Sequence, residues 1–234
     1  MRNDDGPVND AGPAGDAGRI SRPTEPDLAD LERQDDRWIE RVDAAMAEAA
    51  RACRGRWGCG PGRVQCCIGP FPIHQLDAQR LRRGRSILEQ SDPARAAALA
   101  SRVETAVGIL AEDFPGDLDS GVLDDDEEEL ERLCEELQDQ PCPVLDPETG
   151  RCDLYAHRPR VCRTFGPPLR LAHGNLEECP YCFDALRSDE RESLRVEPDR
   201  EGQEKVLLER LESTTGASGL TLIALALRPR LPGG

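Results

Sequence analysis

The spacing of apolar and polar residues predicts a chain built mainly of helices. In residues 27–53, apolar side chains recur at intervals of three and four, as they do on one face of an α-helix. The same period recurs further along the chain, in residues 74–90, 92–114, 124–140 and 200–214. Residues 219–227 form a short apolar run, which we expect to be helical or partly helical.

Three of the predicted helices begin with a local signal. Pro26 precedes the first helical range, and Asp92 followed by Pro93 is typical of an N-cap with proline in the first turn. His74 opens another range, and Asp77 stands three residues later, where a capping side chain is often found.

Two irregular segments interrupt the helical pattern, at residues 53–73 and 142–182. Both are rich in cysteine, glycine, proline and arginine, and such segments have few ways to become ordered without a cross-link or a bound ion. Residues 1–25 contain almost no apolar side chains, so we expect a disordered N-terminal tail.

These ranges predict a mainly α fold in which helices flank an irregular, cysteine-rich metal-binding core. We expect three parts along the chain. They are the tail at 1–25, a cysteine-cluster metal-binding domain at 26–190 with a helical insertion at 74–140, and a C-terminal helical extension at 191–234.

Charge and cysteine content exclude some classes of partner and favour metal binding. The net charge of -16 argues against a partner of DNA or RNA, which requires a positive face. The first residues lack the apolar stretch of a signal peptide, and the apolar run at 219–227 is too short to cross a membrane. We therefore expect a cytoplasmic protein with no membrane partner. Thiols are kept reduced there, so metal binding explains the ten cysteines better than disulfides do.

Nine clustered cysteines are the candidate metal ligands: Cys53, Cys59, Cys66, Cys67, Cys142, Cys152, Cys162, Cys179 and Cys182. Cys179 and Cys182 form a C-x-x-C pair, whose spacing suits chelation of one metal but also a thioredoxin-like redox pair. The adjacent Cys66 and Cys67 reach one tetrahedral ion only with strain, so they belong to two centres or one of them packs. Cys134 stands alone in a helical range, and we interpret it as a core-facing small side chain.

Charged residues and histidines accompany the cysteines. Metal-bound thiolates carry excess negative charge, so Arg158 and Arg163 are candidates for donating hydrogen bonds to the sulfurs. Alternatively, the arginines pair with acidic helices at the surface. His157 is a further candidate ligand, and His74 and His173 are weaker ones. The six consecutive acids at 124–129 form either a solvated helix face or a docking site for a basic partner.

We interpret the stretch from Gly150 to Cys162 as a segment that folds back on itself around a metal centre. Gly150 allows a turn, and Leu154 with Tyr155 would anchor a short turn in the core. Pro159 stops any helix that begins earlier, and so would turn Cys162 back toward the same metal centre.

The cysteine pattern resembles the YkgJ-type cysteine-cluster family, described as a zinc- or iron-chelating CxxCxxCC domain. The resemblance covers about residues 53–182. The second segment matches closely, at Cys142, Leu145, Asp146, Gly150, Cys152, Tyr155, Arg158, Pro159, Cys162 and Arg163. The first segment departs, because insertions separate Cys53, Cys59 and Cys66. Cys66 and Cys67 are the safest residues to carry over from the family motif.

Three functions follow from the residues and the resemblance. The first is a metal-binding protein that holds iron or an iron–sulfur cluster through cysteine thiolates. The second is a structural zinc module that supports an interaction with a protein partner. The third is an oxidoreductase or a relative of protein methyltransferases, but the chain shows no glycine-rich cofactor loop after a strand and no identifiable catalytic base. Whether the protein is an enzyme stays open.

Overall fold

The computed structural model describes residues 25–52, 64–167, 169–170, 176–177, 179, 187, 189–190 and 195–229. The predicted disordered tail lies outside these residues apart from Glu25, with which the first helix begins. The division into three domains stays a prediction.

The prediction of a mainly helical fold is confirmed. The helices are α1 (Glu25–Ala52), α2 (Gln75–Ser91), α3 (Pro93–Leu110), α4 (Glu127–Glu136), α5 (Arg160–Thr164), α7 (Gln203–Thr215) and α8 (Ile223–Leu227). Two 3₁₀ turns, η1 (Gln65–Cys67) and η2 (Tyr155–His157), lie in the cysteine-rich segments. Asp92 caps α3 as expected, because its side chain accepts a hydrogen bond from the Arg95 amide at 3.1 Å.

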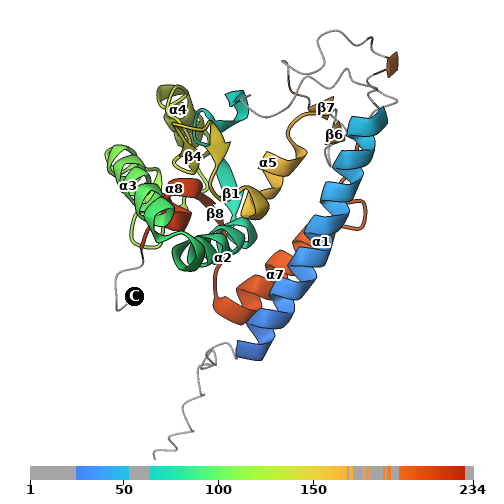
Figure 1. Cartoon of the computed structure of the whole chain (residues 1–234), viewed down its shortest axis with the longest axis horizontal. Coiled ribbons are helices and arrows are strands. Elements are labelled where there is room, and N and C mark those ends of the chain that lie inside the picture. Colours follow the sequence, from blue (N-terminus) through green and yellow to red (C-terminus); the bar gives the residue numbers. More distant parts are fainter. Residues whose placement is uncertain are drawn as a thin grey trace, which may run out of the picture.

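Helices α1 and α7 lie side by side and form one half of the molecule (Figure 1). Their apolar faces bury Trp38 and Val42 of α1 against Leu207 and Leu211 of α7. Leu76 at the start of α2 joins the same cluster, so this pair of helices is continuous with the rest of the core.

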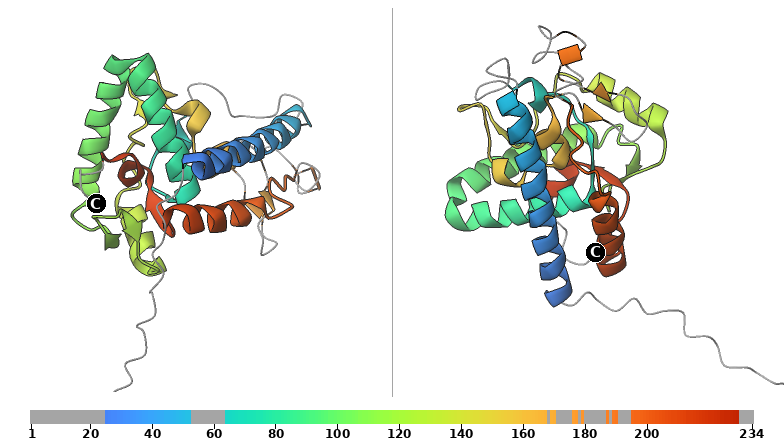
Figure 2. Two further views of the ribbon diagram at one scale, coloured as in Figure 1. Left: turned by 90° about the horizontal axis from the view of Figure 1, so that it is seen from below. Right: turned by 90° about the vertical axis from the view of Figure 1, so that its right-hand side faces the viewer.

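Helices α2 and α3 follow one another as a hairpin and pack with α8 in the other half (Figure 2). Their cluster includes Leu81, Leu99 and Val103, all of them almost completely buried. Cys142 and Cys152 pack against the edge of this cluster. The cysteine-rich segment is thereby attached to the helical core by its own thiol-bearing residues.

The strands are short and form two-stranded pairs. Strand β1 (Pro72–His74) pairs antiparallel with β8 (Leu220–Leu222), so the end of the chain is tied to the start of α2. The other pairs are β2 (Gly116–Asp117) with β3 (Val122–Leu123), β4 (Leu145–Asp146) with β5 (Arg151–Cys152), and β6 (Leu169–Arg170) with β7 (Leu176–Glu177). A search of the described part of the chain found no helix with the length and apolar character needed to cross a membrane.

Two local expectations are modified. The run at 219–227 divides into strand β8 and the short helix α8, because its first half pairs with β1. His74 does stand at the N-cap of α2, but no side chain caps that helix. Asp77 instead contacts Arg80 and the first amide of α5.

Candidate metal centre

Five cysteines from four separate segments line a single cavity of about 720 Å³. Cys66 and Cys67 come from η1, Cys142 from the segment before β4, Cys152 from β5 and Cys162 from α5. We call this space the thiol cavity. Its remaining walls are formed by one face of α1 and by the helical core, so the segments that carry these five cysteines meet between the two halves of the molecule.

Backbone hydrogen bonds join the first cysteine segment to the second. The Cys142 amide donates to the Cys67 carbonyl at 2.8 Å, and the Gly69 amide donates to the Gln140 carbonyl at 2.7 Å. An isolated antiparallel bridge between Ile68 and Pro141 lies between them. The main chain therefore holds the Cys66-Cys67 pair beside Cys142, more than 70 residues away in sequence.

The β4–β5 hairpin brings Cys152 to the same place. Leu145 pairs with Cys152 in this hairpin, and Gly150 in its turn adopts a φ of 63°, a left-handed conformation that favours glycine. Leu154, which follows, is 2% exposed and anchors the next turn in the core, as expected. Tyr155 is 64% exposed, so the expectation of a second core anchor is wrong. Its ring packs instead against Arg158, whose guanidinium carbon lies 3.9 Å from the ring centre.

Helix α5 is positioned by a carboxylate from α2. Pro159 stands at its N-cap, and the Arg160 amide donates to Asp77 at 2.7 Å. Asp77 also contacts the buried Arg80, which donates from Nε to Asp35 of α1 at 2.6 Å. The buried Arg80 thus joins α1 to α2, and Asp77 extends this network to α5, the element that carries Cys162.

The thiols of the cavity influence one another electrostatically. Burial raises the pKa of Cys142 to about 11, and the neighbouring Cys152 and Cys66 contribute in the same direction. Burial also raises the pKa of Cys162, with contributions from Cys142 and Cys152. A hydrogen bond with Cys67, together with burial, raises the pKa of Cys66. The metal-free protein therefore holds these thiols protonated at neutral pH, since charging one disfavours charging the next.

The two candidate arginines have different surroundings. Arg158 lowers the pKa of Cys66 and of Cys152, against the larger effect of burial, so its charge faces the thiols. Arg163 lines the cavity but is occupied: it donates to Asp43 of α1 at 2.5 Å, to the Arg158 carbonyl at 3.1 Å and to the Ala156 carbonyl. Arg158 itself donates to the Tyr155 carbonyl at 2.9 Å and lies 3.9 Å from Asp43, so both arginines pair with an acid of α1. Hydrogen bonds from either arginine to a metal-bound sulfur stay a prediction.

Other sequence candidates lie elsewhere. Cys179 is buried, and its amide donates to the Gly166 carbonyl at 3.0 Å, but it is not among the residues that line the thiol cavity. Cys134 is only partly buried in α4 and lies outside the cavity as well. His157 packs on α2 at Gly84, and burial lowers its pKa. The described residues do not include Cys53, Cys59, Cys182 or His173.

The thiol cavity fits a thiophilic metal by the chemistry of its donors. Thiolates are the ligands of zinc and of iron–sulfur centres, and Arg158 supplies compensating charge. Within the described residues, no three Cys, His, Asp or Glu side chains already converge as the ligand set of one ion. The seven described cysteines are free thiols, so none is withheld from metal by a disulfide.

Sequence reasoning missed two acidic residues around the cavity. Asp43 lines it and binds Arg163, and Asp77 holds α5. The exposed face of a helix is where an acid such as Asp43 is expected, so its sequence position gives no signal. Asp77 did give a signal, but the helix-capping rule assigned it to its own helix.

The fold and the cavity define a mainly helical protein with cysteine-rich segments folded between two helical units. A family model matches residues 52–183, more than half of the chain, and its family is CxxCxxCC, described as "Putative zinc- or iron-chelating domain". The chain belongs to this family, which confirms the resemblance seen in the sequence. The family description supports binding of a metal ion. The searches of curated proteins and of solved structures found no match.

Proposed function

We propose that this protein binds iron or an iron–sulfur cluster through thiolates of the thiol cavity. The observation that carries the proposal is that Cys66, Cys67, Cys142, Cys152 and Cys162, from four separate segments, line one cavity. Thiols that only filled a core would not need to share a cavity with charged arginine side chains.

The volume of the cavity supports a cluster over a single small ion. About 720 Å³ is far more than one metal ion needs, and a cluster of several iron and sulfide atoms would use more of that space. Arg158 would face the excess negative charge that four thiolates bring to such a centre. The bound group would supply electron-transfer or redox-sensing chemistry, and the residues of this chain would bind it and limit its contact with water.

A structural zinc ion is the second candidate, and the short elements around the cavity favour it. η1, β4, β5, η2 and α5 each contain five residues or fewer. Elements of this length gain little from their own hydrogen-bond ladders, and structural zinc sites often stabilise such irregular segments. A cytoplasmic, reducing location is part of both proposals, because thiolate ligands must stay reduced.

Purification without oxygen, followed by elemental analysis and a visible spectrum, distinguishes the two. A cluster predicts a brown protein that contains iron and acid-labile sulfide and absorbs broadly near about 400 nm. Zinc predicts a colourless protein with one or two zinc ions per chain. A protein that takes up neither metal, after reconstitution under reducing conditions, would contradict both.

Variants test the cavity itself. Cys142→Ser should lower the metal content at least about tenfold, because the cavity loses one of its thiolate ligands. Cys134→Ser is the matched control, since Cys134 is also partly buried but lies outside the cavity, and it should leave metal content unchanged. Equal losses in the two variants would argue against the thiol cavity as the site.

A further inference from the structure

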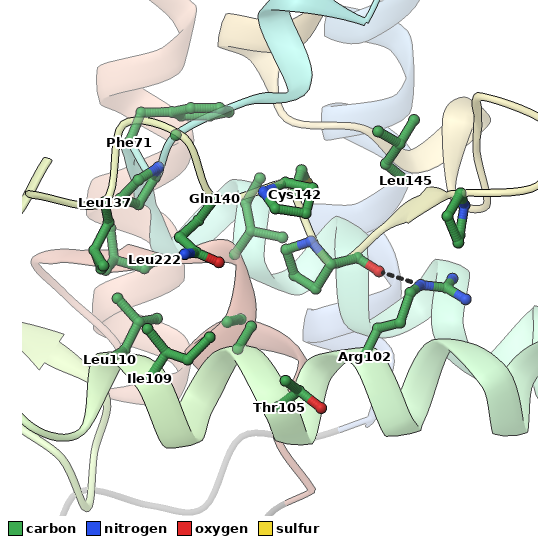
Figure 3. A pocket seen from close by; sticks show the side chains of 18 of the residues that line it. Phe71, Arg102, Thr105, Ile109, Leu110, Leu137, Gln140, Cys142, Leu145 and Leu222 are labelled. Atoms are coloured by element: carbon green, nitrogen blue, oxygen red, sulfur yellow. Dashed lines mark hydrogen bonds between the residues drawn. The ribbon is translucent and has the colours of Figure 1, made fainter.

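A second, apolar groove lies next to the thiol cavity. Phe71, Ile109, Leu110, Leu137, Pro141 and Leu222 line it, and we call it the apolar groove. It lies between α3, the segment that follows α4, and strand β8. Figure 3 shows the aliphatic side chains of Ile109, Leu110, Leu137 and Leu222 gathered toward one end of the groove.

The groove is the open edge of a core cluster. Leu110 and Leu222 are buried members of the cluster between α3 and α4, whereas Ile109 on the same helix is 39% exposed. The groove has a volume of about 290 Å³, which lies at the small end of the range for ligand sites. Its size suits one or two aliphatic side chains, and an exposed apolar surface of this kind is typical of an interaction site.

Arg102 and Thr105, two of the polar side chains in the groove, already have partners. Arg102 donates from Nε to the Pro143 carbonyl at 2.9 Å and also pairs with Asp153. The Thr105 hydroxyl donates to the Ser101 carbonyl at 3.0 Å. The one cation in the lining is therefore neutralised, and the groove has no free positive charge with which to attract an anionic ligand.

The flank of the groove is strongly negative. Ten acids and one arginine occupy residues 124–140, a range that spans α4 and reaches the groove at Leu137 and Gln140. Within the described residues, none of these acids forms an ion pair, although many of the arginines elsewhere do. Charge complementarity therefore selects a cationic occupant.

Acidic side chains on helix α4 also repel one another, and a bound cation would reduce this repulsion. Glu131 lies four residues from both Glu127 and Glu135, and like charges at this spacing destabilise a helix. Glu135 and Glu136 stand in its last turn, where negative charge opposes the helix dipole. Acids at the start of α4 are explained by capping, but those at its end, beside the groove, are not.

We propose that the apolar groove docks a segment of a partner protein that carries one or two apolar side chains flanked by lysine or arginine. The apolar side chains enter the groove over Ile109 and Leu137, and the basic residues lie along the acids of α4. This interaction goes beyond the proposed metal function and does not depend on which metal the thiol cavity binds.

A fluorescent peptide tests the proposal on the full chain. The probe contains two adjacent leucines with two lysines on each side. Two control peptides replace either the leucines or the lysines by serine. Binding is followed by anisotropy at low and at physiological salt. The leucine–lysine probe should bind, and its affinity should fall as salt screens the acidic flank.

Matched protein variants locate the binding. Ile109→Ser should weaken probe binding about tenfold, the loss expected when one buried aliphatic contact is removed. Ile87→Ser, on α2 and 49% exposed but outside the groove, should leave binding unchanged. Glu135→Gln with Glu136→Gln should weaken binding about threefold to fivefold at low salt, whereas Glu201→Gln with Glu212→Gln should not.

Three outcomes would overturn the proposal. They are no binding of the leucine–lysine probe, equal binding to Ile109→Ser and to the unchanged protein, and equal binding of the lysine-free peptide. The last result would assign the groove to a neutral apolar ligand. Metal content, measured on the same samples, separates failure of this proposal from failure of the metal proposal.

Discussion

The cysteines differ most in what surrounds each sulfur. Cys142 lies among other thiols and packs against the helical core. Cys134 is partly buried on α4, and none of the cavity thiols contributes to its pKa. The adjacent Cys67 side chain, together with burial, raises the pKa of Cys66. A cysteine count treats these residues as equal, but their pKa values and their neighbours give them different chemistry.

The metal-free protein should lose stability as pH rises from about 8.5 to about 11. A cysteine in an unfolded chain has a pKa of about 8.5, whereas burial raises that of Cys142 to about 11. The folded state therefore holds its proton more tightly, so this stability is complete below about pH 8.5 and is lost as pH rises through about 11. The loss from Cys142 is about 3 kcal/mol, measurable by urea unfolding in the presence of a chelator.

The control is Cys142→Ser, which should show a shallower decline over the same pH range. The metal-loaded protein should also decline less, because its ligand thiols are already deprotonated. If the free energy of unfolding of the metal-free protein stays level between about pH 8.5 and 11, the pKa of Cys142 is not raised by burial.

At the level of elements, close approach of η2 to α2 positions the second cysteine segment. A Cβ atom on Gly84 would lie 2.6 Å from Cβ and 2.7 Å from Cγ of His157, closer than real contacts allow. Only glycine lets η2 lie this near to α2. The position of His157 among the cysteines made it a candidate ligand, but its side chain packs against α2.

Gly84→Ala should destabilise the protein by about 1–3 kcal/mol, because η2 must move away from α2. Gly108→Ala is the control within a neighbouring helix, where an added methyl group meets nothing within 4 Å. That change should stabilise α3 by about 0.5–1 kcal/mol through helix propensity. Thermal unfolding of both variants checks the prediction, and a shift of the same sign in both would contradict it.

Asp77 links stability to the position of α5. Asp77→Asn should cost about 3 kcal/mol, since the buried Arg80 loses one of its two carboxylates. It should also lower metal affinity, because the Arg160 amide loses its charged acceptor and α5 carries Cys162.

Asp35→Asn provides the comparison for this prediction. It removes the other carboxylate from Arg80 but no contact with α5. Metal affinity, measured by competition with a chelator, should fall in Asp77→Asn more than in Asp35→Asn. Equal affinities at equal stability loss would mean that Asp77 acts on the fold alone.

For the whole molecule, helical periodicity was enough to predict most of the architecture. Helices α3 and α4 fall within the ranges expected from the apolar pattern, and α1, α2 and α7 extend one or two residues beyond theirs. The pattern was informative because these helices bury aliphatic side chains on one face. The β1–β8 pairing was not predicted, since it joins residues almost 150 positions apart and each strand has three residues. Pairing over such a distance leaves no local trace in the sequence.

Some of the cysteines that line the thiol cavity could be named from the sequence, but how the cysteines are grouped in space could not. The family motif gave Cys142, Cys152 and Cys162 as candidate ligands, and the local turn residues predicted that Cys162 turns back toward the centre of Cys152; all three line the thiol cavity. Cys179 belonged to the same predicted set, but its backbone contact with Gly166 places it after α5, and it does not line the cavity. Separation of this kind depends on tertiary packing, which spacing alone does not contain.

Metal removal should loosen the cysteine-rich segments while most helices persist. The cluster of α1 with α7 and the one between α3 and α4 are formed by apolar side chains and do not include the cavity thiols. Addition of a chelator should therefore increase hydrogen exchange at residues 141–165, with little change in α3 or α7. Uniform exchange across the chain after chelation would show that the metal holds the entire fold.

The apolar groove and the thiol cavity have part of their walls in common. Phe71, Cys142, Leu145 and Ile223 line both spaces. A metal that fixes the Cys142 side chain therefore also sets the shape of the groove, and a peptide in the groove restricts the same residue. By thermodynamic linkage, if one ligand changes the affinity of the other by some factor, the second changes the affinity of the first by the same factor. The partner would in this way distinguish the metal-loaded protein from the metal-free one without touching the metal.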